Sequence, residues 1–204
     1  LLLTWAGHET TAGHISWAVA DLLGHPDFLA GLQAQQDDVV GGPDHRDVPS
    51  ATQLSRLTHM EAALHETERL HPVAFMLVRT AARDFDHAGH RIPDGAMVLI
   101  SPAVAHRLPD VYPEPDRYLP ERHHRDDAPP AAGAALAKLI GFGGGVHRCL
   151  GVHFAYLEMK VILTLLLRRY TLTLLDQNPQ PIPGARTKWP AGPCRVAYRV
   201  RPGA

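Results

Sequence analysis

Cysteine is scarce in this chain of 204 residues, which contains only Cys149 and Cys194. Two cysteines so far apart in sequence form neither the disulfide framework of a small secreted domain nor the paired C-x-x-C motif of a structural zinc module. A single bridge between them is the minor alternative. We therefore expect two reduced thiols and a cytoplasmic location.

The chain also lacks an excess of charge of either sign, because 20 Lys and Arg residues face 21 Asp and Glu residues. A net charge near zero provides no basic surface for nucleic acid or for an anionic membrane. We therefore expect no nucleic-acid partner.

A long uncharged hydrophobic run is missing as well. The apolar opening LLLTWAGHETTAGHISWAVADLL is interrupted by His8, Glu9, His14 and Asp21, whereas a membrane span needs about twenty apolar residues in succession. The opening predicts a buried helix that begins in mid-run without Met, so we expect the chain to be a fragment. An anchor upstream of Leu1 would lie outside the sequence, which leaves membrane association open.

Periodicity and helix breakers predict a mainly α chain with small β-sheets. Ser50 is expected to cap a short turn, and a stripe of Leu57, Met60, Leu64 and Thr67 predicts an amphipathic helix. Residues 150–170 are apolar on all sides, which favours a core helix. The predicted elements are helices over 1–23, 27–40, 57–70 and 150–170, strands and hairpins within 73–100, an irregular surface meander over 109–130, and a strand over 194–200.

What the chain does have is a run of glycines before one of its cysteines, FGGGVHRCLG at residues 142–151. A phosphate loop would need Lys followed by Ser or Thr, and a zinc site would need more ligands than Cys149 and His147. A buried structural cysteine is another alternative. Glycines let backbone N–H groups approach a metal-bound sulfur, and the helix that follows favours a thiolate. In extended backbone His147 would project to the same side as Cys149 and could reach an anionic cofactor edge.

The same stretch resembles the haem-binding signature of the cytochrome P-450 superfamily, which it matches at Phe142, Gly143, Gly145, His147, Cys149 and Gly151. The resemblance implies the C-terminal portion of the cytochrome P-450 fold and haem b as cofactor. It implies that Cys149 is the axial ligand of the haem iron, that Phe142 shields its sulfur and that Gly143 is part of the cofactor-binding loop. His147 would bind a haem propionate.

Residues 6–11 read AGHETT and resemble the oxygen-activating stretch on the central helix of that family. Gly7 leaves room for dioxygen, and the Thr10 hydroxyl can bond back to the Ala6 carbonyl and distort the helix. Glu9 and Thr10 are then expected to be catalytic, as an acid and alcohol pair that relays protons, with Ala6 on the substrate side. A solvated pair on an ordinary helix is the alternative.

Glu66 and Arg69 resemble the E-x-x-R motif of the family and, three residues apart, share one helix face. With Arg122 the resemblance implies a buried structural triad that holds the cysteine loop in place. A surface ion pair of little energetic weight is the alternative. The family usually has an aromatic residue where this chain has His123, a departure that weakens the expected local packing.

Arg79, in the run FMLVRTA, matches a family position that contacts a haem propionate, for which a bidentate guanidinium is suited. Ala74, Phe75 and Met76, just before it, would line the substrate side of the haem. The alternative for this run is a simple buried strand.

The resemblance covers residues 1–204, as the C-terminal part of a single P-450 catalytic domain whose N-terminal half is absent. It implies a monooxygenase that inserts one atom of dioxygen into a C–H bond of a small lipophilic substrate. Electrons would come from NAD(P)H indirectly, through a ferredoxin or flavoprotein reductase.

Two stretches, LVRTAARDFDHAGHRIPDG and SPAVAHRLP, are similar to sterol 14-alpha-demethylases, although those enzymes usually have His where this chain has Glu9. Sterol demethylation is therefore a narrower hypothesis. A truncated, non-catalytic remnant is the alternative from another class. A zinc- or iron-binding protein that uses histidines such as His123 and His124 is a third.

Overall fold

A computed structural model describes residues 2–41, 48–123, 139–176, 179–183, 188–192 and 194–201. The helices are α1 (Leu2–Gly24), α2 (Pro26–Val40), α3 (Ala51–Arg56), α4 (Thr58–Leu70), α5 (Pro102–Ala105) and α7 (Val152–Arg169), with the 3-10 turns η1 (Pro120–His123) and η2 (Gly145–His147). The strands are β1 (Leu77–Thr80), β2 (Phe85–His87), β3 (His90–Ile92), β4 (Met97–Ile100), β5 (Tyr170–Leu174) and β6 (Val196–Val200). The mainly α architecture with small sheets is confirmed.

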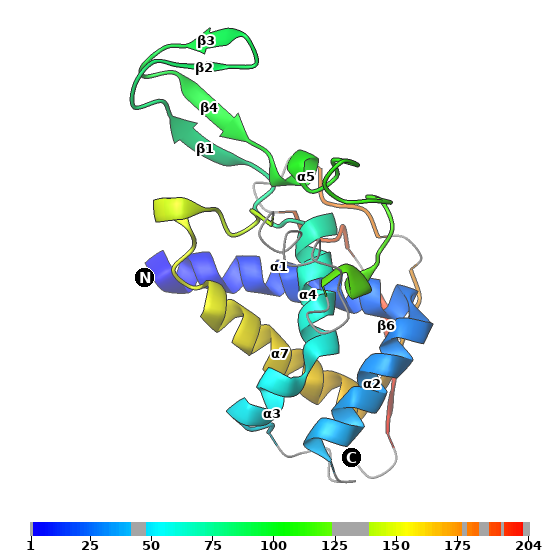
Figure 1. Cartoon of the computed structure of the whole chain (residues 1–204). Helices are drawn as coiled ribbons and strands as arrows, with labels where there is room; N and C mark the ends of the chain where they lie inside the picture. The colour runs from blue at the N-terminus through cyan, green and yellow to red at the C-terminus, as the bar shows by residue number, and fades with distance from the viewer. Residues whose placement is uncertain are drawn as a thin grey trace.

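Three antiparallel pairs make up the strands of the described residues: β1 with β4, β2 with β3, and β5 with β6. In Figure 1 the first two hairpins extend away from the helical body, while β6 lies beside α2 near the C-terminal end. The predicted hairpins within 73–100 are confirmed, and the predicted strand over 194–200 is confirmed from Val196 onward.

The core forms where α1, α2, α4 and α7 pack together. The predicted stripe on α4 is confirmed, because Leu57, Met60, Leu64 and Thr67 are all fully buried. Each such Leu or Met contributes roughly 1.5–3 kcal/mol through burial of its apolar surface. The side chains that meet the stripe include Ala18 and Leu22 of α1, Leu32 and Val39 of α2, and Met159, Leu163 and Leu167 of α7.

Asp21 and Trp17, in the C-terminal half of α1, contact the C-terminal end of α4. Asp21 accepts hydrogen bonds from Thr67 Oγ1 at 2.8 Å and from His71 Nε2 at 3.1 Å. Trp17 stacks on the His71 ring with centroids 3.9 Å apart and donates from Nε1 to the Lys188 carbonyl. The angle between the two helices is therefore set by directional contacts as well as by apolar packing.

The short helix α3 begins where the sequence predicts a cap. Ser50 Oγ accepts from the Gln53 N–H, while Gln53 Oε1 accepts from the Ser50 N–H at 2.9 Å. This reciprocal capping box satisfies two N–H groups that the first helical turn leaves free.

The predicted core helix over 150–170 is present as α7 and contributes to the core, but it is not buried on all sides. Met159 and Leu163 of α7 are fully buried, but Leu150 before it and Phe154 and Leu157 on it are 97%, 70% and 47% exposed. Only one face of α7 finds a partner among the described residues, so the apolar composition of the other face has no packing partner there. No helix in this described part of the chain is long and apolar enough to cross a bilayer.

The meander after α5 is also less superficial than predicted. Tyr112, Tyr118 and His123 are 1%, 7% and 5% exposed, although the segment has little regular structure up to η1. Residues 124–130 of the predicted meander lie outside the described residues, as does His124.

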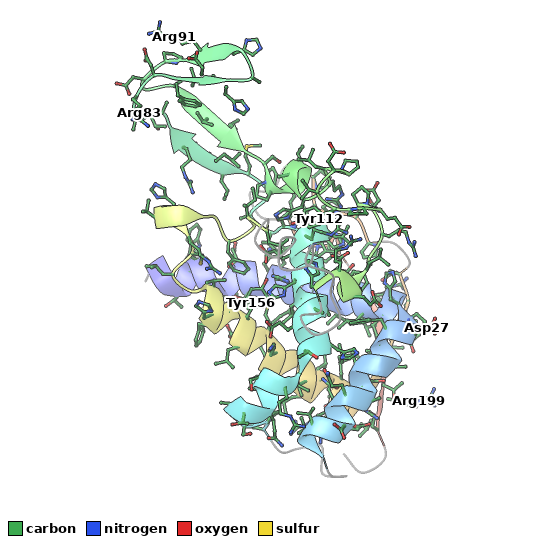
Figure 2. All side chains as sticks on the ribbon, in the orientation of Figure 1. Asp27, Arg83, Arg91, Tyr112, Tyr156 and Arg199 are labelled. Atoms are coloured by element: carbon green, nitrogen blue, oxygen red, sulfur yellow. The ribbon has the colours of Figure 1, made fainter. Side chains whose placement is uncertain are left out.

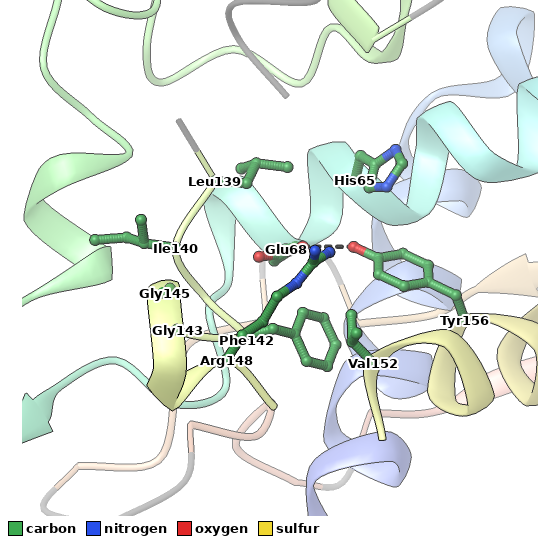
Figure 3. Close-up of a pocket in the computed structure, with 11 residues that line it drawn as sticks. His65, Glu68, Leu139, Ile140, Phe142, Gly143, Gly145, Arg148, Val152 and Tyr156 are labelled. Atoms are coloured by element: carbon green, nitrogen blue, oxygen red, sulfur yellow. Dashed lines mark hydrogen bonds between the residues drawn. The ribbon is translucent and has the colours of Figure 1, made fainter. Parts of the chain in front are cut away.

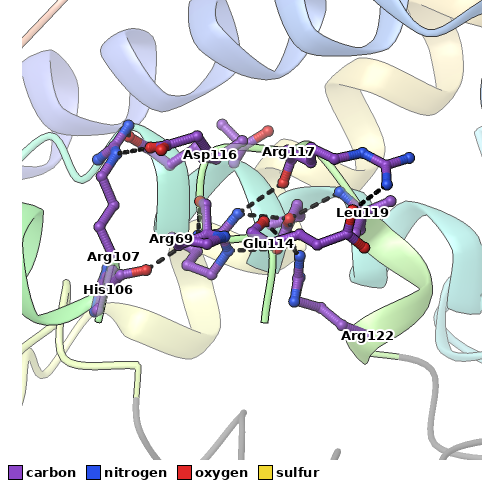
Figure 4. A network of polar contacts seen from close by, with 12 residues as sticks. Arg69, His106, Arg107, Glu114, Asp116, Arg117, Leu119 and Arg122 are labelled. Carbon is purple, nitrogen blue, oxygen red and sulfur yellow. Dashed lines mark hydrogen bonds and ion pairs between the residues drawn. The ribbon is translucent and has the colours of Figure 1, made fainter. Parts of the chain in front are cut away.

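Arg69 of α4 connects Glu66 to this meander, and every N–H of its guanidinium has a partner. Nε and Nη2 donate to the two carboxylate oxygens of Glu66, each at 2.8 Å. The other donors reach the carbonyls of His106, Pro115 and Arg117 at 3.0, 2.6 and 2.9 Å (Figure 4). Because Arg69 and Glu66 are fully buried, these bonds replace the hydration that both charges lose.

Glu66 is equally well satisfied. Its oxygens also accept from the Leu119 N–H at 2.8 Å, from Arg122 Nε at 3.1 Å and from His123 Nε2 at 2.8 Å. Burial alone would raise the pKa of Glu66, but the hydrogen bonds from Arg69 and His123 outweigh it and lower the pKa to about 2. The predicted triad is therefore buried, and the surface alternative is wrong.

His123, which stands where the family usually has an aromatic residue, is buried and bonded to Glu66. Burial lowers the pKa of His123 even though its bond to Glu66 opposes that shift. A neutral imidazole still donates from Nε2, so His123 adds a hydrogen bond to the triad while it fills buried space.

We expect Glu66→Gln to lower the free energy of unfolding by about 3–5 kcal/mol, because the change leaves the buried Arg69 charge without its counter-ion. Urea unfolding followed by far-UV circular dichroism measures the difference. Asp84→Asn is the matched control, since Asp84 pairs with Arg91 on the surface, where solvent screens the two charges and the pair contributes little to stability. Equal losses in the two variants would contradict the structural weight given to the triad.

Candidate active site

The cysteine loop folds back on itself between Ile140 and Cys149. The Cys149 N–H donates to the Phe142 carbonyl at 2.8 Å, and the Gly143 N–H donates to the Ile140 carbonyl at 2.9 Å. Gly143 has a φ of +75°, and a Cβ on it would lie 2.8 Å from the His147 carbonyl oxygen. At Gly143 the backbone itself therefore requires glycine, for its left-handed conformation and for close approach within the loop.

One cavity of about 280 Å³ joins this loop to the first helix. Ala6 and Thr10 of α1 line it together with Phe142, His147 and Cys149 of the loop. Ala74, shortly before β1, and Leu77, the first residue of β1, also line this cavity. The fold thus brings the AGHETT segment and the cysteine loop, which are far apart in the sequence, to the walls of the same cavity.

The bond predicted for Thr10 is present. Thr10 Oγ1 donates to the Ala6 carbonyl at 2.6 Å. The helix runs unbroken from Leu2 to Gly24, so the bond occurs without a break in α1. Its effect is to aim the hydroxyl back along a helix turn that lines the cavity.

Five of the residues predicted for catalysis, cofactor or substrate do not line this cavity, and one of them, Gly143, lines a neighbouring cavity instead. Glu9 is exposed, Met76 is 42% exposed, and the Phe75 ring packs under Lys188 Nζ at 4.6 Å. Arg79 donates to the Val78 carbonyl, but it lies two residues beyond the cavity-lining Leu77. Since alternate residues of a strand share a face, Arg79 is on the side of β1 that Leu77 presents to the cavity.

His147 reaches the cavity by a route other than the predicted one. Extended backbone is predicted at His147, whereas Gly145–His147 forms the 3-10 turn η2. The turn nevertheless leaves His147 and Cys149 on the wall of the same cavity. The premise of extended geometry is wrong, and the two side chains still face one space.

Glu68 is a site residue that the sequence reasoning missed. It is 5% exposed, lines the cavity, and accepts a hydrogen bond from the Tyr156 hydroxyl (Figure 3). Its carboxylate also accepts from the backbone N–H groups of Gly141 and Phe142. Burial raises the pKa of Glu68 to about 7 in spite of these bonds. The available signal was its position four residues after Leu64, on the apolar stripe of α4.

His14 is the second missed residue, one helical turn after Thr10 and on the same wall. Its Nε2 lies 3.0 Å from the Leu64 carbonyl, to which it donates. Burial lowers the pKa of His14 to about 4, so its imidazole is neutral at physiological pH. The i, i+4 spacing from Thr10 was the signal that could have found it.

The triad reaches the cysteine loop only indirectly. Its hydrogen bonds go to the meander between His106 and Leu119, and His106 Nε2 in turn accepts from the Ile140 N–H at 2.9 Å. Glu68, from the same helix turn as Glu66 and Arg69, bonds to the loop directly.

The residues around the cavity fit a thiolate-bound haem better than a bare metal ion. Cys149 and Cys194 are both free, and Cys149 is exposed at a loop whose glycine leaves no room for a side chain. Within the ranges that the structure describes, no group of three or more His, Cys, Asp or Glu side chains could hold a metal ion. A lone thiol beside an imidazole on a largely apolar wall suits an iron whose other ligands come from a porphyrin.

Helices packed around a cavity between a threonine-bearing helix and a glycine-lined cysteine loop are the arrangement expected of a haem-thiolate protein. A family model described as Cytochrome P450 matches residues 1–191. The chain therefore belongs to the cytochrome P450 family, and this membership implies haem b as its cofactor.

Relatives agree with the family. The chain is 37% identical to a "Sterol 14alpha-demethylase" of Mycolicibacterium vanbaalenii over 204 residues, which is 98% of this chain and 43% of the relative. It is 38% identical to a "Putative cytochrome P450 139" of Mycobacterium bovis, over 90% of this chain and 41% of the relative. A "Sterol 14-demethylase" of Arabidopsis thaliana is 33% identical, over 97% and 41%. The chain thus spans less than half the length of the relatives that it matches.

Gly143→Ala should destabilise the loop by at least about 1 kcal/mol, because a side chain there adopts left-handed backbone and meets the His147 carbonyl. Gly144→Ala is the matched control, since Gly144 has a φ of −157° and nothing lies within 4 Å of an added Cβ. Thermal unfolding and the amount of haem taken up per chain are the two measurements. If both variants behaved alike, the loop would not depend on the Gly143 conformation.

Proposed function

We propose that the protein containing this chain is a haem-thiolate monooxygenase that inserts one atom of dioxygen into a C–H bond of a small lipophilic substrate. Support comes above all from the single cavity that Ala6 and Thr10 share with Cys149. We further propose that the chain is the C-terminal part of a single catalytic domain, in line with the share of its relatives that it covers.

Cys149 is the proposed axial ligand. When bound, haem b supplies the iron at which dioxygen is reduced and one oxygen atom is transferred. Helix α7 begins at Val152, just after Cys149, so the positive end of its dipole favours the thiolate form of the sulfur. The Cys149 N–H is held by the Phe142 carbonyl, which fixes the backbone from which the thiol projects.

His147 and Arg79 are the proposed partners of the haem propionates. His147 lies on the cavity wall, and Arg79 is on the same strand face as Leu77. The guanidinium can form two parallel hydrogen bonds to one carboxylate, which would orient the cofactor plane. Ala6, Ala74, Phe75 and Met76 are the proposed substrate-side residues, of which Ala6 and Ala74 line the cavity.

Thr10 is the proposed proton donor at the cavity wall. Its hydroxyl proton points to the Ala6 carbonyl, and a rotation about χ1 would turn it toward the cavity that Thr10 lines. Glu9 is exposed at the preceding position and can take up protons from solvent. The pair would then pass protons from solvent through the Glu9 carboxyl to Thr10 Oγ1.

The electron source and the substrate follow from the class of reaction. Two electrons must arrive from NAD(P)H through a ferredoxin or flavoprotein reductase, and the exposed Arg148 beside Cys149 suits an acidic partner surface. The largely apolar wall suits a lipophilic substrate. Sterol demethylation is the narrower candidate, supported by the names of the relatives from Mycolicibacterium vanbaalenii and Arabidopsis thaliana.

A non-catalytic remnant is the second candidate, and one observation favours it. Trp5, Phe154 and Leu150 are 66%, 70% and 97% exposed, so large apolar surfaces of α1 and α7 have no partner among the described residues. Such surfaces cost stability in an isolated chain and weaken any cofactor site that they border.

Cys149→Ala should abolish the thiolate-type Soret band in the reduced carbon monoxide difference spectrum, because the substitution removes the only proposed ligand. Cys194→Ala is the matched control and should retain the band, since Cys194 does not line the cavity. A thiolate-type band that survives Cys149→Ala refutes the ligand. Failure of the unaltered chain to bind haem would favour the non-catalytic remnant.

Thr10→Ala should leave haem binding intact while product formation falls by about a hundred-fold, and electrons should be lost to hydrogen peroxide. Ser16→Ala is the matched control, because Ser16 makes the same back-bond, to the Ala12 carbonyl, without lining the cavity. The measurements are product and hydrogen peroxide formed per NAD(P)H consumed. Tightly coupled turnover in Thr10→Ala would remove Thr10 from the proton route.

A further inference from the structure

We propose that Glu68 is a positioning residue that anchors the cysteine loop to α4 through its buried carboxylate, and that loss of the carboxylate charge loosens the backbone that presents Cys149. The inference deepens the proposed haem-thiolate function and rests on it for the role of Cys149. It concerns only groups of this chain, so it can be tested on the loop itself.

Three donors from two separate segments converge on this carboxylate. The Tyr156 hydroxyl reaches it from α7, and the N–H groups of Gly141 and Phe142 reach it from the start of the loop. A Cβ on Gly141 would lie 2.6 Å from Glu68 Oε1, so the loop backbone packs directly against the carboxylate. An acceptor with a full negative charge makes such bonds about twice as strong as a neutral one.

The anchor is one hydrogen bond away from the proposed ligand. Glu68 fixes the Phe142 N–H, and the Phe142 carbonyl accepts from the Cys149 N–H at 2.8 Å. Phe142 also packs against the Tyr156 ring, with centroids 5.4 Å apart. A shift of the Phe142 peptide would therefore move the Cys149 backbone as well.

Glu68 also stands between two cavities. One is the cavity that Thr10 and Cys149 line, and the other, of about 290 Å³, is lined by His65, Arg148 and Tyr156 together with the loop glycines (Figure 3). Glu68 and Phe142 line both cavities, so the bonds to Glu68 hold the part of the loop that the two cavities share.

The charged and titratable side chains that share a cavity with Glu68 are His14, His65, His147, Arg148, Cys149 and Tyr156, and His106 contacts its backbone. Burial raises the pKa of Glu68 to about 7. Burial also raises the pKa of Tyr156 well above its usual range and that of Tyr112 to about 12, and it lowers the pKa of His65 to about 3. The charge of Arg148 opposes the shift of Glu68. The Tyr156 hydroxyl is therefore a neutral donor, and His65 is neutral between about pH 6 and about pH 8.

The sign of the pH effect follows. Above the pKa of Glu68 the carboxylate accepts all three bonds, and below it the neutral carboxyl is a weaker acceptor. The loop should be better held at about pH 8 than at about pH 6, once the intrinsic pH dependence of exchange is removed. The hydrogen bond from Tyr156 lowers the pKa of Glu68. Loss of this bond should therefore move the midpoint of the pH-dependent change in protection to higher pH.

Amide hydrogen exchange of residues 139–151 tests the proposal, in the haem-loaded protein and in the haem-free chain. In the unaltered protein, protection at Gly141, Phe142 and Cys149 should rise about ten-fold from about pH 6 to about pH 8. Glu68→Gln should abolish that rise, and Tyr156→Phe should shift its midpoint upward. Glu61→Gln is the matched control, because Glu61 is a carboxylate of the same helix that joins α4 to α7 through Lys160 at 2.7 Å.

The fraction of thiolate-type Soret band in the haem-loaded protein provides a second readout, which should follow the same pH profile and become flat in Glu68→Gln. Exchange that is independent of pH and unaltered in Glu68→Gln would overturn the proposal. If Glu68→Gln does not fold, the midpoint shift in Tyr156→Phe decides, and its absence overturns the proposal equally. A pH-dependent loop in a chain whose Soret band is not of the thiolate type would retain the anchor and refute only the proposed function.

Discussion

The fully buried charge pair of Glu66 and Arg69 is the constraint on which the rest of the structure depends. Two charges removed from water must be compensated by geometry, and here every guanidinium N–H and both carboxylate oxygens have partners. Most of those partners are backbone groups of the meander between His106 and Leu119. An otherwise irregular segment is thereby given one defined path across α4.

Helix α4 serves two sites because of its own periodicity. Glu66 and Glu68 are two residues apart, which on an α-helix separates their directions by about 200°. One carboxylate therefore faces the meander and the other faces the cysteine loop, and their environments drive their pKa values apart. Glu66, surrounded by cationic and N–H donors, is held ionised with a pKa of about 2, whereas burial raises the pKa of Glu68 to about 7.

Features that depend on local sequence could be predicted from spacing alone, whereas the distant pairing of Arg122 with Glu66 was predicted only through the family resemblance, and other distant contacts were missed. The α4 stripe, the Ser50 cap and the Thr10 back-bond follow from spacings of three or four residues, and the structure contains all of them. The role of His123 depends on a carboxylate 57 positions earlier in the chain, and that of Glu68 on loop amides more than 70 positions later. No periodicity encodes those pairings. Burial of the outer face of α7 was predicted wrongly for a similar reason. Composition shows that a surface is apolar, but it does not show whether another segment covers that surface.

The closed turn of the cysteine loop has a consequence for the electronic character of the sulfur. A thiolate donates less electron density to a metal as more N–H groups bond to it. The N–H of Cys149 points instead to the carbonyl of Phe142, at 2.8 Å. The Cys149 amide therefore does not bond to the sulfur, so the thiolate would donate more electron density than one that accepts such a bond. If Cys149 held a haem iron, the hydrogen bond that shapes this backbone would thus favour the ferric over the ferrous state.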